Sequence, residues 1–166
     1  MNKVLYIILI SLFSLTVFSC SDDKEEYSAT GTTDDTTTTD DTTTCDSTVS
    51  FVAVGPDGTI LTSSDNGISW CSRTSGTSQS LFGITYGNST FVAVGANGTM
   101  LTSPDNGSTW TSSGSGISNT LWGVIYGKSA FVVVGQTGTI LTSSDGSSWT
   151  SRSSGTSSHL EDVISN

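Results

Sequence analysis

"SSDNGISW" at residues 63–70, "SPDNGSTW" at 103–110 and "SSDGSSW" at 143–149 are three versions of one phrase. A second stretch repeats ahead of each of them, because "FVAVG" or "FVVVG" begins at residues 51, 91 and 131, a period of 40 residues. A fixed period of this length indicates structural units that are stacked or arranged around an axis. The phrases therefore mark three copies of one structural unit.

Each unit contains short runs of β-branched and aromatic residues, separated by Gly, Asn, Asp and Ser. No helical period is present, so each unit is predicted to be a four-stranded antiparallel meander. In the first unit the strands are expected at 51–55, 59–63 and 69–73, and the fourth strand of each unit is expected to begin at its tryptophan. The predicted fold class is all-β, a partial β-propeller of three four-stranded antiparallel blades over residues 49–166.

The repeated phrase joins the third strand of a unit to the fourth. An Asp after a strand can fold its carboxylate back onto backbone N–H groups, and the following Gly supplies a positive φ. The Trp is expected to cover the hairpin and to pack against the neighbouring unit. A structural role is therefore predicted for Ser63, Asp65, Gly67, Trp70, Ser103, Asp105, Gly107, Trp110, Ser143, Asp145, Gly146 and Trp149.

The phrase resembles the Asp-box, or BNR, repeat of sialidase-like β-propellers, and the longer unit resembles the repeats of Ycf48-type propellers. The resemblance implies a ring of blades in which the last strand completes the first blade. Blade one has no first strand ahead of it, while Leu160–Ile164 in "LEDVISN" matches the first strand of a unit. Three arrangements stay open: a second copy that completes a six-bladed ring, an open arc of three blades, or a piece of a longer propeller.

Sialidase chemistry, which the resemblance suggests, needs an arginine triad, a tyrosine nucleophile paired with a glutamate, and an acid. Residues 49–166 offer only Arg73 and Arg152, at equivalent repeat positions, and Glu161 is the sole glutamate after residue 26. No catalytic residue, metal site or cofactor is therefore predicted, and His159 has no partner at metal-ligand spacing. The alternative is a sialidase or glycoside-hydrolase-like enzyme that is assembled across chains or survives as a remnant.

A non-catalytic binding or assembly module is the main functional prediction. Propeller ligands usually meet the loops that enter each innermost strand and the loops between the second and third strands. These loops are small, polar and rich in hydroxyl groups, which suits a glycan or protein ligand of unknown identity. The larger side chains on them, and hence the candidate ligand-facing residues, are Arg73, Gln79, Asn97, Gln136, Arg152 and His159.

The N-terminus resembles that of a bacterial lipoprotein. An apolar run covers residues 4–18, too short for a bilayer span of about 20 residues, and is followed by Ser19 and Cys20. Residues 1–19 are predicted to be a lipoprotein signal peptide, and Cys20 the lipidated residue. Residues 20–48, rich in Thr and Asp, are predicted to be a disordered tether. The expected location is the bacterial outer membrane or cell surface, with a lipid anchor.

The net charge and the number of cysteines indicate which further partner is not expected and which disulfide is. The net charge is −10, and no basic cluster exists that could neutralise phosphates, so nucleic-acid binding is not expected. Once Cys20 is lipidated, Cys45 and Cys71 remain as an even pair in an oxidising compartment. A Cys45–Cys71 disulfide between the tether and blade one is predicted.

Overall fold

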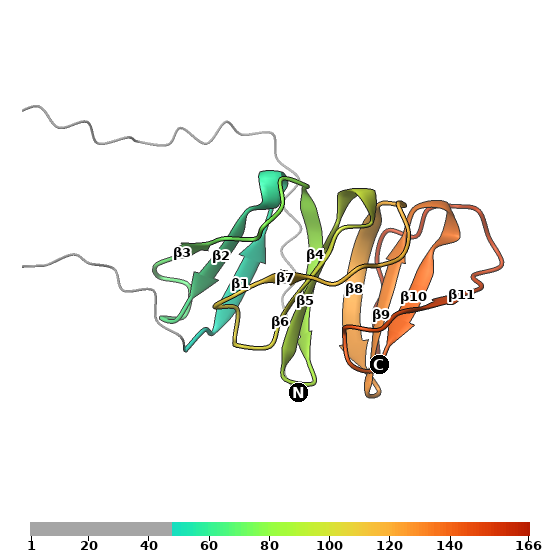
Figure 1. Cartoon of the computed structure of the whole chain (residues 1–166). Coiled ribbons are helices and arrows are strands. Elements are labelled where there is room, and N and C mark those ends of the chain that lie inside the picture. The colour runs from blue at the N-terminus through green and yellow to red at the C-terminus, as the bar shows by residue number, and fades with distance from the viewer. Residues whose placement is uncertain (1–47) are drawn as a thin grey trace, which may run out of the picture. The chain divides into compact units, whose positions relative to one another are not determined.

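A computed structural model describes residues 48–166 and contains three antiparallel sheets (Figure 1). The predicted fold class, an all-β partial propeller, is confirmed. The sheets have the strand orders β1-β2-β3, β4-β5-β6-β7 and β8-β9-β10-β11, and are called blades one, two and three. The strands are β1 (Phe51–Val54), β2 (Ile60–Ser63), β3 (Cys71–Arg73), β4 (Leu81–Gly87), β5 (Thr90–Gly95), β6 (Met100–Ser103), β7 (Thr111–Ser112), β8 (Leu121–Gly127), β9 (Ala130–Gly135), β10 (Ile140–Ser143) and β11 (Thr150–Arg152).

A short 3₁₀ turn joins the second strand position of each blade to the third. These turns are η1 (Pro56–Gly58), η2 (Ala96–Gly98) and η3 (Gln136–Gly138). The middle residue of each has a left-handed φ between 52° and 57°, and the glycine after it also has a positive φ. Glycine adopts this conformation without a steric penalty, so the glycine that ends each turn allows the same register in all three hairpins.

The core lies at the junctions between blades. Neighbouring residues of β5 point to opposite faces of the sheet, as expected for a strand. Ala93 belongs to the cluster shared with blade one, whereas Val92 and Val94 belong to the cluster shared with blade three. The continuous apolar run "FVAVG" is therefore explained by burial of both faces of the middle blade.

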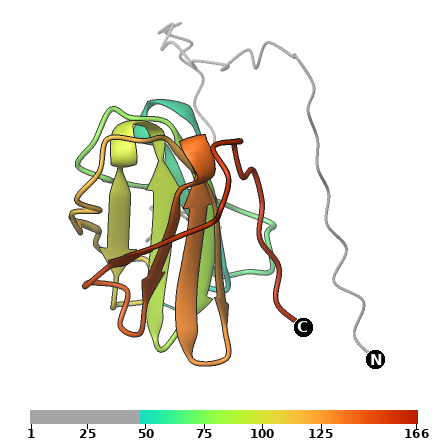
Figure 2. The ribbon, with the colours of Figure 1, turned by 90° about the vertical axis from the view of Figure 1, so that its right-hand side faces the viewer.

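Two details of the predicted blades are wrong. The fourth strands begin one residue after the tryptophan, at Cys71, Thr111 and Thr150, because the indole belongs to the loop that precedes the strand. Residues 160–166 form no strand and do not complete blade one. The Leu160 N–H instead donates to the Gly135 carbonyl at 3.0 Å, and the segment runs beside blade three (Figure 2).

This placement has a simple cause. The chain leaves blade one through a loop that returns it to Gly55, where the Leu81 N–H donates at 2.9 Å. The loop after blade three has nearly the same length and returns the chain to Gly135, the equivalent residue. The C-terminal segment therefore occupies the place of the first strand of a following blade.

Several predictions fall on residues that the structure does not describe. Residues 1–19, Cys20, Cys45 and almost all of the 20–48 tether lie outside the described residues, so the lipid anchor and the Cys45–Cys71 pairing stay predictions. Cys71 itself is the first residue of β3. Within residues 48–166, no helix combines the length and the apolar composition needed to cross a bilayer.

Candidate functional site

The loops that connect one blade to the next gather beside the 3₁₀ turns, at one end of the strands (Figure 1). These loops are residues 74–80 and 113–120, and residues 153–159 form the equivalent loop after blade three; all three are called inter-blade loops. Backbone hydrogen bonds fix them there, because the Ala96 N–H donates to the Ser80 carbonyl at 2.9 Å and the Gln136 N–H to the Thr120 carbonyl at 2.8 Å. The inter-blade loops and the 3₁₀ turns together are called the loop face.

Close backbone contact holds each inter-blade loop against its 3₁₀ turn. A Cβ atom placed on Gly98 would overlap the carbonyl oxygen of Ile117, and Gly58 and Gly138 have the same relation to Thr77 and Thr156. Only a residue without a side chain fits this gap. The loop face is therefore a packed surface with a fixed backbone.

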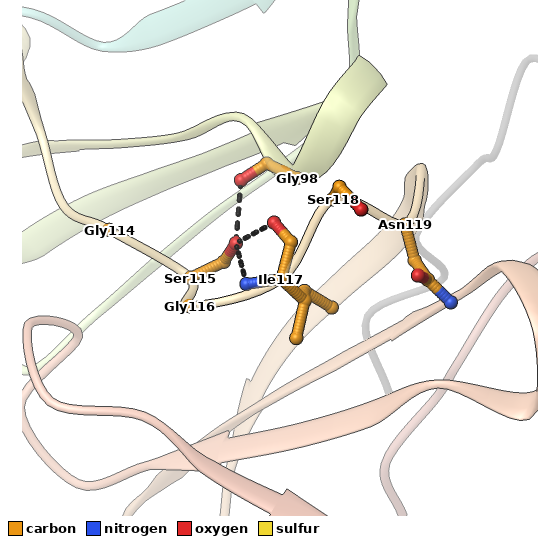
Figure 3. A pocket seen from close by; sticks show the side chains of 7 residues that line it. All are labelled: Gly98, Gly114, Ser115, Gly116, Ile117, Ser118 and Asn119. Atoms are coloured by element: carbon orange, nitrogen blue, oxygen red, sulfur yellow. Dashed lines mark hydrogen bonds between the residues drawn. The ribbon is translucent and has the colours of Figure 1, made fainter.

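A repeated serine turn shapes each inter-blade loop. In the loop between blades two and three, the Ser115 hydroxyl lies 2.8 Å from the Gly98 carbonyl oxygen and 3.0 Å from that of Ile117 (Figure 3). Ser115 Oγ also accepts a hydrogen bond from the Ile117 N–H at 3.3 Å. A shallow hollow of about 690 Å³ lies over this turn, between Gly98 and Asn119. Its lining presents backbone groups, hydroxyls, the Asn119 amide and one aliphatic side chain.

Four of the predicted ligand-facing residues lie on the loop face. Asn97 Nδ2 donates to Gln79 Oε1 at 2.7 Å. Gln136 Oε1 accepts a hydrogen bond from the Thr120 N–H at 3.4 Å, and His159 Nδ1 accepts one from the Thr137 N–H at 3.0 Å. Each of these pairs joins an inter-blade loop to the neighbouring 3₁₀ turn, so amide and imidazole groups lie where the loops meet the turns.

The two predicted arginines do not join this group. Arg73 Nε donates to Thr62 Oγ1 at 2.8 Å, and Arg152 Nε donates to Thr142 Oγ1 at 2.9 Å. Both side chains are bonded across the outer strands of their own blades. They are therefore not brought together with Gln79 or His159.

An aromatic pair on the innermost strands escaped the sequence reasoning. Phe82 of β4 stacks on Trp122 of β8 with 4.7 Å between ring centroids, and Phe82 is 44% exposed. Both follow the leucine that begins their strand, at the end nearest the loop face. The sequence marks this pair only as an aromatic residue after the leucine in "LFG" and "LWG", which does not show that the two rings meet.

The repeated phrases form what we call the box loops, residues 63–70, 103–110 and 143–149. In blade two, the Ser103 hydroxyl donates to Asp105 Oδ1 at 2.7 Å and accepts from the Gly107 N–H at 2.8 Å. Asp105 also accepts from the Thr109 N–H at 3.0 Å and from the Thr109 hydroxyl at 2.6 Å. Partial burial raises the pKa of Asp105, but these hydrogen bonds outweigh it and lower the pKa to about 2.

The other two box loops use their carboxylates in the same way. Hydrogen bonds from the Ser69 hydroxyl and N–H hold the pKa of Asp65 well below its usual range. Backbone N–H groups of Ser148 and Ser147 do the same for Asp145. All three aspartates are thus ionised acceptors engaged within their own loops, away from the loop face.

Within residues 48–166, the other acidic side chains lie in two separate places. Asp57 occupies the left-handed position of η1, while Glu161 and Asp162 lie on the segment beside β8. Among residues 48–166 there is no group of three His, Cys, Asp or Glu side chains that could hold a metal ion. The loop face therefore offers hydrogen bonds and an aromatic surface for recognition.

Three antiparallel sheets packed side by side, one of three strands and two of four, make a partial β-propeller fold. Among solved structures, YCF48 bound to D1 peptide is similar, with a TM-score of 0.53 and 19% identity over 60% of this chain and 35% of that chain. YCF48 from Cyanidioschyzon merolae has a TM-score of 0.51 and 21% identity over 60% of this chain and 32% of its own. The chain thus spans about a third of these structures, and at such identity the likeness shows the fold alone.

No family model matches the sequence. No curated protein matches it either.

Proposed function

We propose that residues 48–166 are a non-catalytic propeller module whose loop face binds an extended segment of another protein. The observation that carries this proposal is the pairing of a fixed polar loop surface with the exposed ring of Phe82. Amide groups of Gln79, Asn97 and Asn119 can hydrogen-bond a peptide backbone, and an aromatic ring supplies apolar area at low entropy cost. The solved YCF48 structure that holds a D1 peptide supports a peptide ligand for this class of fold.

A peptide suits this surface better than a compact ligand does. The hollow over Ser115 is shallow and open, so it would leave most of a small molecule exposed to water. An extended chain can instead lie across several inter-blade loops and pair with the exposed backbone groups on each. Such contacts are individually weak, so affinity would depend on a few central side chains such as Phe82.

The test is selection of binders from a display library of short random peptides against the purified chain, followed by titration of the enriched peptides. Phe82→Ala is expected to weaken binding about tenfold or more. Tyr86→Ala is the matched control, because Tyr86 is 50% exposed on the same strand but at the opposite end. Failure to enrich any peptide, or equal binding by wild type and Phe82→Ala, would overturn the proposal.

Enzyme activity is the competing function, and the same preparation tests it. Sialosides and other glycosides that release a fluorophore should not be turned over above the rate with heat-denatured protein. Turnover that depends on Glu161 or Asp57 would replace the binding proposal with the enzyme alternative.

We also propose that the module is held at the cell surface by lipid on Cys20 and that it completes its propeller by self-association. The support for the anchor is the apolar run that ends at Cys20 and the acidic, Thr-rich stretch after it. Intact mass of the protein from membranes should show an acylated N-terminus at Cys20. It should also be lower by two hydrogen atoms, because the Cys45 and Cys71 thiols are oxidised to a disulfide, and a reductant should restore them. An unmodified Cys20 would refute the anchor, and a mass unchanged by reductant would refute the disulfide.

A further inference from the structure

Each box loop packs back onto the blade that precedes it. A Cβ atom placed on Gly107 would lie 3.4 Å from the Thr62 methyl group and 3.5 Å from Val52, both in blade one. In blade three, Gly146 has the same relation to Val92 of blade two, at 3.1 Å. The junctions between blades one and two and between blades two and three are thus the same interface, repeated.

Within residues 48–166, the box loop of blade one has no preceding blade to pack against. Its Trp70 is 42% exposed, whereas Trp110 is 8% exposed, although each indole N–H makes the same bond to the glycine three residues earlier. Phe51 on the same blade is 49% exposed, and Ile68 is 85% exposed where blade two has Ser108. Trp70 thus has the local geometry of the covered Trp110, but these apolar side chains stay exposed in the described part of the chain.

Blade three presents the complementary surface. Val132 and Thr142 are the repeat equivalents of Val52 and Thr62, the two residues against which the next box loop packs. They line two neighbouring hollows of about 330 and 380 Å³ that meet at Ala130. The surface that receives a box loop at each internal junction is therefore open at the end of the blade row.

The C-terminal segment adds a strand edge to this surface. A Cβ atom on Gly123 would lie 3.1 Å from Asp162 and 3.2 Å from Glu161, much as one on Gly83 would lie 2.9 Å from the Trp122 carbonyl. Residues 160–165 thus stand in the position of an innermost strand, with blade three on one side. Blade one begins with β1 at its inner edge, which is the edge that such a strand would pair with.

We propose that two copies of this chain join head to tail, with β1 and the box loop of one copy seated on blade three and residues 160–165 of the other. The pairing of β4 with β5 gives the register: Val163 opposite Ala53, Ile164 opposite Val52 and Ser165 opposite Phe51. Trp70 and Ile68 cover Val132 and Thr142 of the second copy. Two such junctions close a ring of six blades, within the four to eight that are usual for propellers.

A second copy is the occupant because the contacts it would make are those the chain already makes twice within itself. Exposed strand edges and apolar loops that match each other at the two ends of one chain generate a head-to-tail contact, which closes to a ring when the rotation fits. This inference rests on the self-association proposed above. It does not depend on the peptide ligand of the loop face.

The first test is the molar mass of the full chain by light scattering over a concentration series, in detergent if the chain is acylated. Wild type is expected to give twice the monomer mass, and Ile68→Asp to raise the dissociation constant about tenfold or more, since a charge replaces an apolar side chain in the junction. Asn106→Asp is the matched control, because it adds the same charge to an exposed position of the box loop of blade two. It should leave the mass unchanged.

The second test fixes the register. A photoreactive benzoylphenylalanine at position 51, in a mixture of ¹⁵N-labelled and unlabelled chains, should form adducts between chains at residues 163–166. A monomer at every concentration would overturn the inference, as would adducts confined to the chain that carries the probe. A dimer that is insensitive to Ile68→Asp and gives adducts elsewhere would also overturn it. Peptide binding is measured separately, so its failure leaves this result unaffected.

Discussion

At the scale of single residues, the fold depends on polar side chains that form hydrogen bonds within their own loops. Ser103 is fully buried, yet its hydroxyl bonds both Asp105 and the Gly107 N–H, so its burial does not leave this hydroxyl unpaired. Leaving such a donor or acceptor without a partner costs about 1–3 kcal/mol. The repeated Ser-x-Asp spacing is therefore a requirement of the turn, which explains its return in every blade.

The lowered pKa of the box aspartates predicts acid sensitivity. The pKa of Asp105 is about 2 in the folded chain and 3.8 without its partners, so the unfolded chain binds a proton more readily. Stability is then full above about pH 4 and falls as the pH drops towards 2. Urea unfolding at several pH values should show this fall, and it should be smaller in Asp105→Asn. An unchanged slope in that variant would contradict the role given to its hydrogen bonds.

The glycines of the loop face predict a graded response to alanine. Gly98→Ala should lower the free energy of unfolding by about 3 kcal/mol, because it combines a positive φ with overlap on the Ile117 carbonyl. Gly116→Ala should cost about 1 kcal/mol, since its φ is also positive but nothing lies within 4 Å of the added Cβ. Urea titration of both variants measures the difference. Equal losses would show that the loop is not held against the turn.

At the scale of elements, blades one and two are each covered by the tryptophan of the blade that follows. Trp110 joins Ile60 of blade one in a single buried cluster, and Trp149 packs against the cluster that contains Val92 of blade two. A blade therefore has no complete core of its own. Destabilising one blade should therefore also destabilise its neighbours, as in other repeat proteins.

This dependence predicts unequal costs for equivalent tryptophans. Trp110→Ala should lower the free energy of unfolding by about 4 kcal/mol, whereas Trp70→Ala should lower it by less than half as much in protein dilute enough to be monomeric. The reason is that Trp110 is covered by blade one and Trp70 is half exposed. Denaturant titrations followed by far-UV circular dichroism provide the comparison. A similar loss in both variants would contradict the sealing of blades in sequence.

The shortened third box loop predicts a stabilising insertion. Trp70 and Trp110 donate their indole N–H to Gly67 and Gly107, but the buried Nε1 of Trp149 has no hydrogen-bond partner among residues 48–166. An asparagine inserted between Asp145 and Gly146 restores the length of the other boxes. It should raise the free energy of unfolding by about 1 kcal/mol. A decrease in the melting temperature would show that the shorter turn is the better fit.

At the scale of the whole molecule, the sequence period predicted the blades, their strand order and the polar loop face. The period could not place residues 160–166, because "LEDVISN" fits the inner edge of blade one and the far side of blade three equally well. Their position is decided by the length of the loop before them, which carries Leu160 to Gly135. The repeat pattern alone therefore does not determine where the C-terminal segment lies, because its position depends on the three-dimensional path of the chain.

The same limit explains the mixed outcome at the candidate site. Gln79 and Asn97 lie in contact because the inter-blade loop and the 3₁₀ turn have the same relative position in every blade. Arg73 and Arg152 do not reach the face, because each finds a threonine hydroxyl two residues along the facing strand. Phe82 and Trp122 were missed because stacking between blades depends on the angle of the blades, which one-dimensional spacing does not encode.

The proposed ring has two parts: three blades that cover one another in order, and a second copy that covers the first blade. The most direct measurement is hydroxyl-radical footprinting of Trp70 and Trp110 over a dilution series, with mass spectrometry to count the modified indoles. Trp110 is expected to be protected at every concentration, while Trp70 is expected to be reactive in dilute protein and to become protected as the concentration rises. Equal reactivity of Trp70 and Trp110 in dilute protein, or a Trp70 whose reactivity never changes, would contradict it.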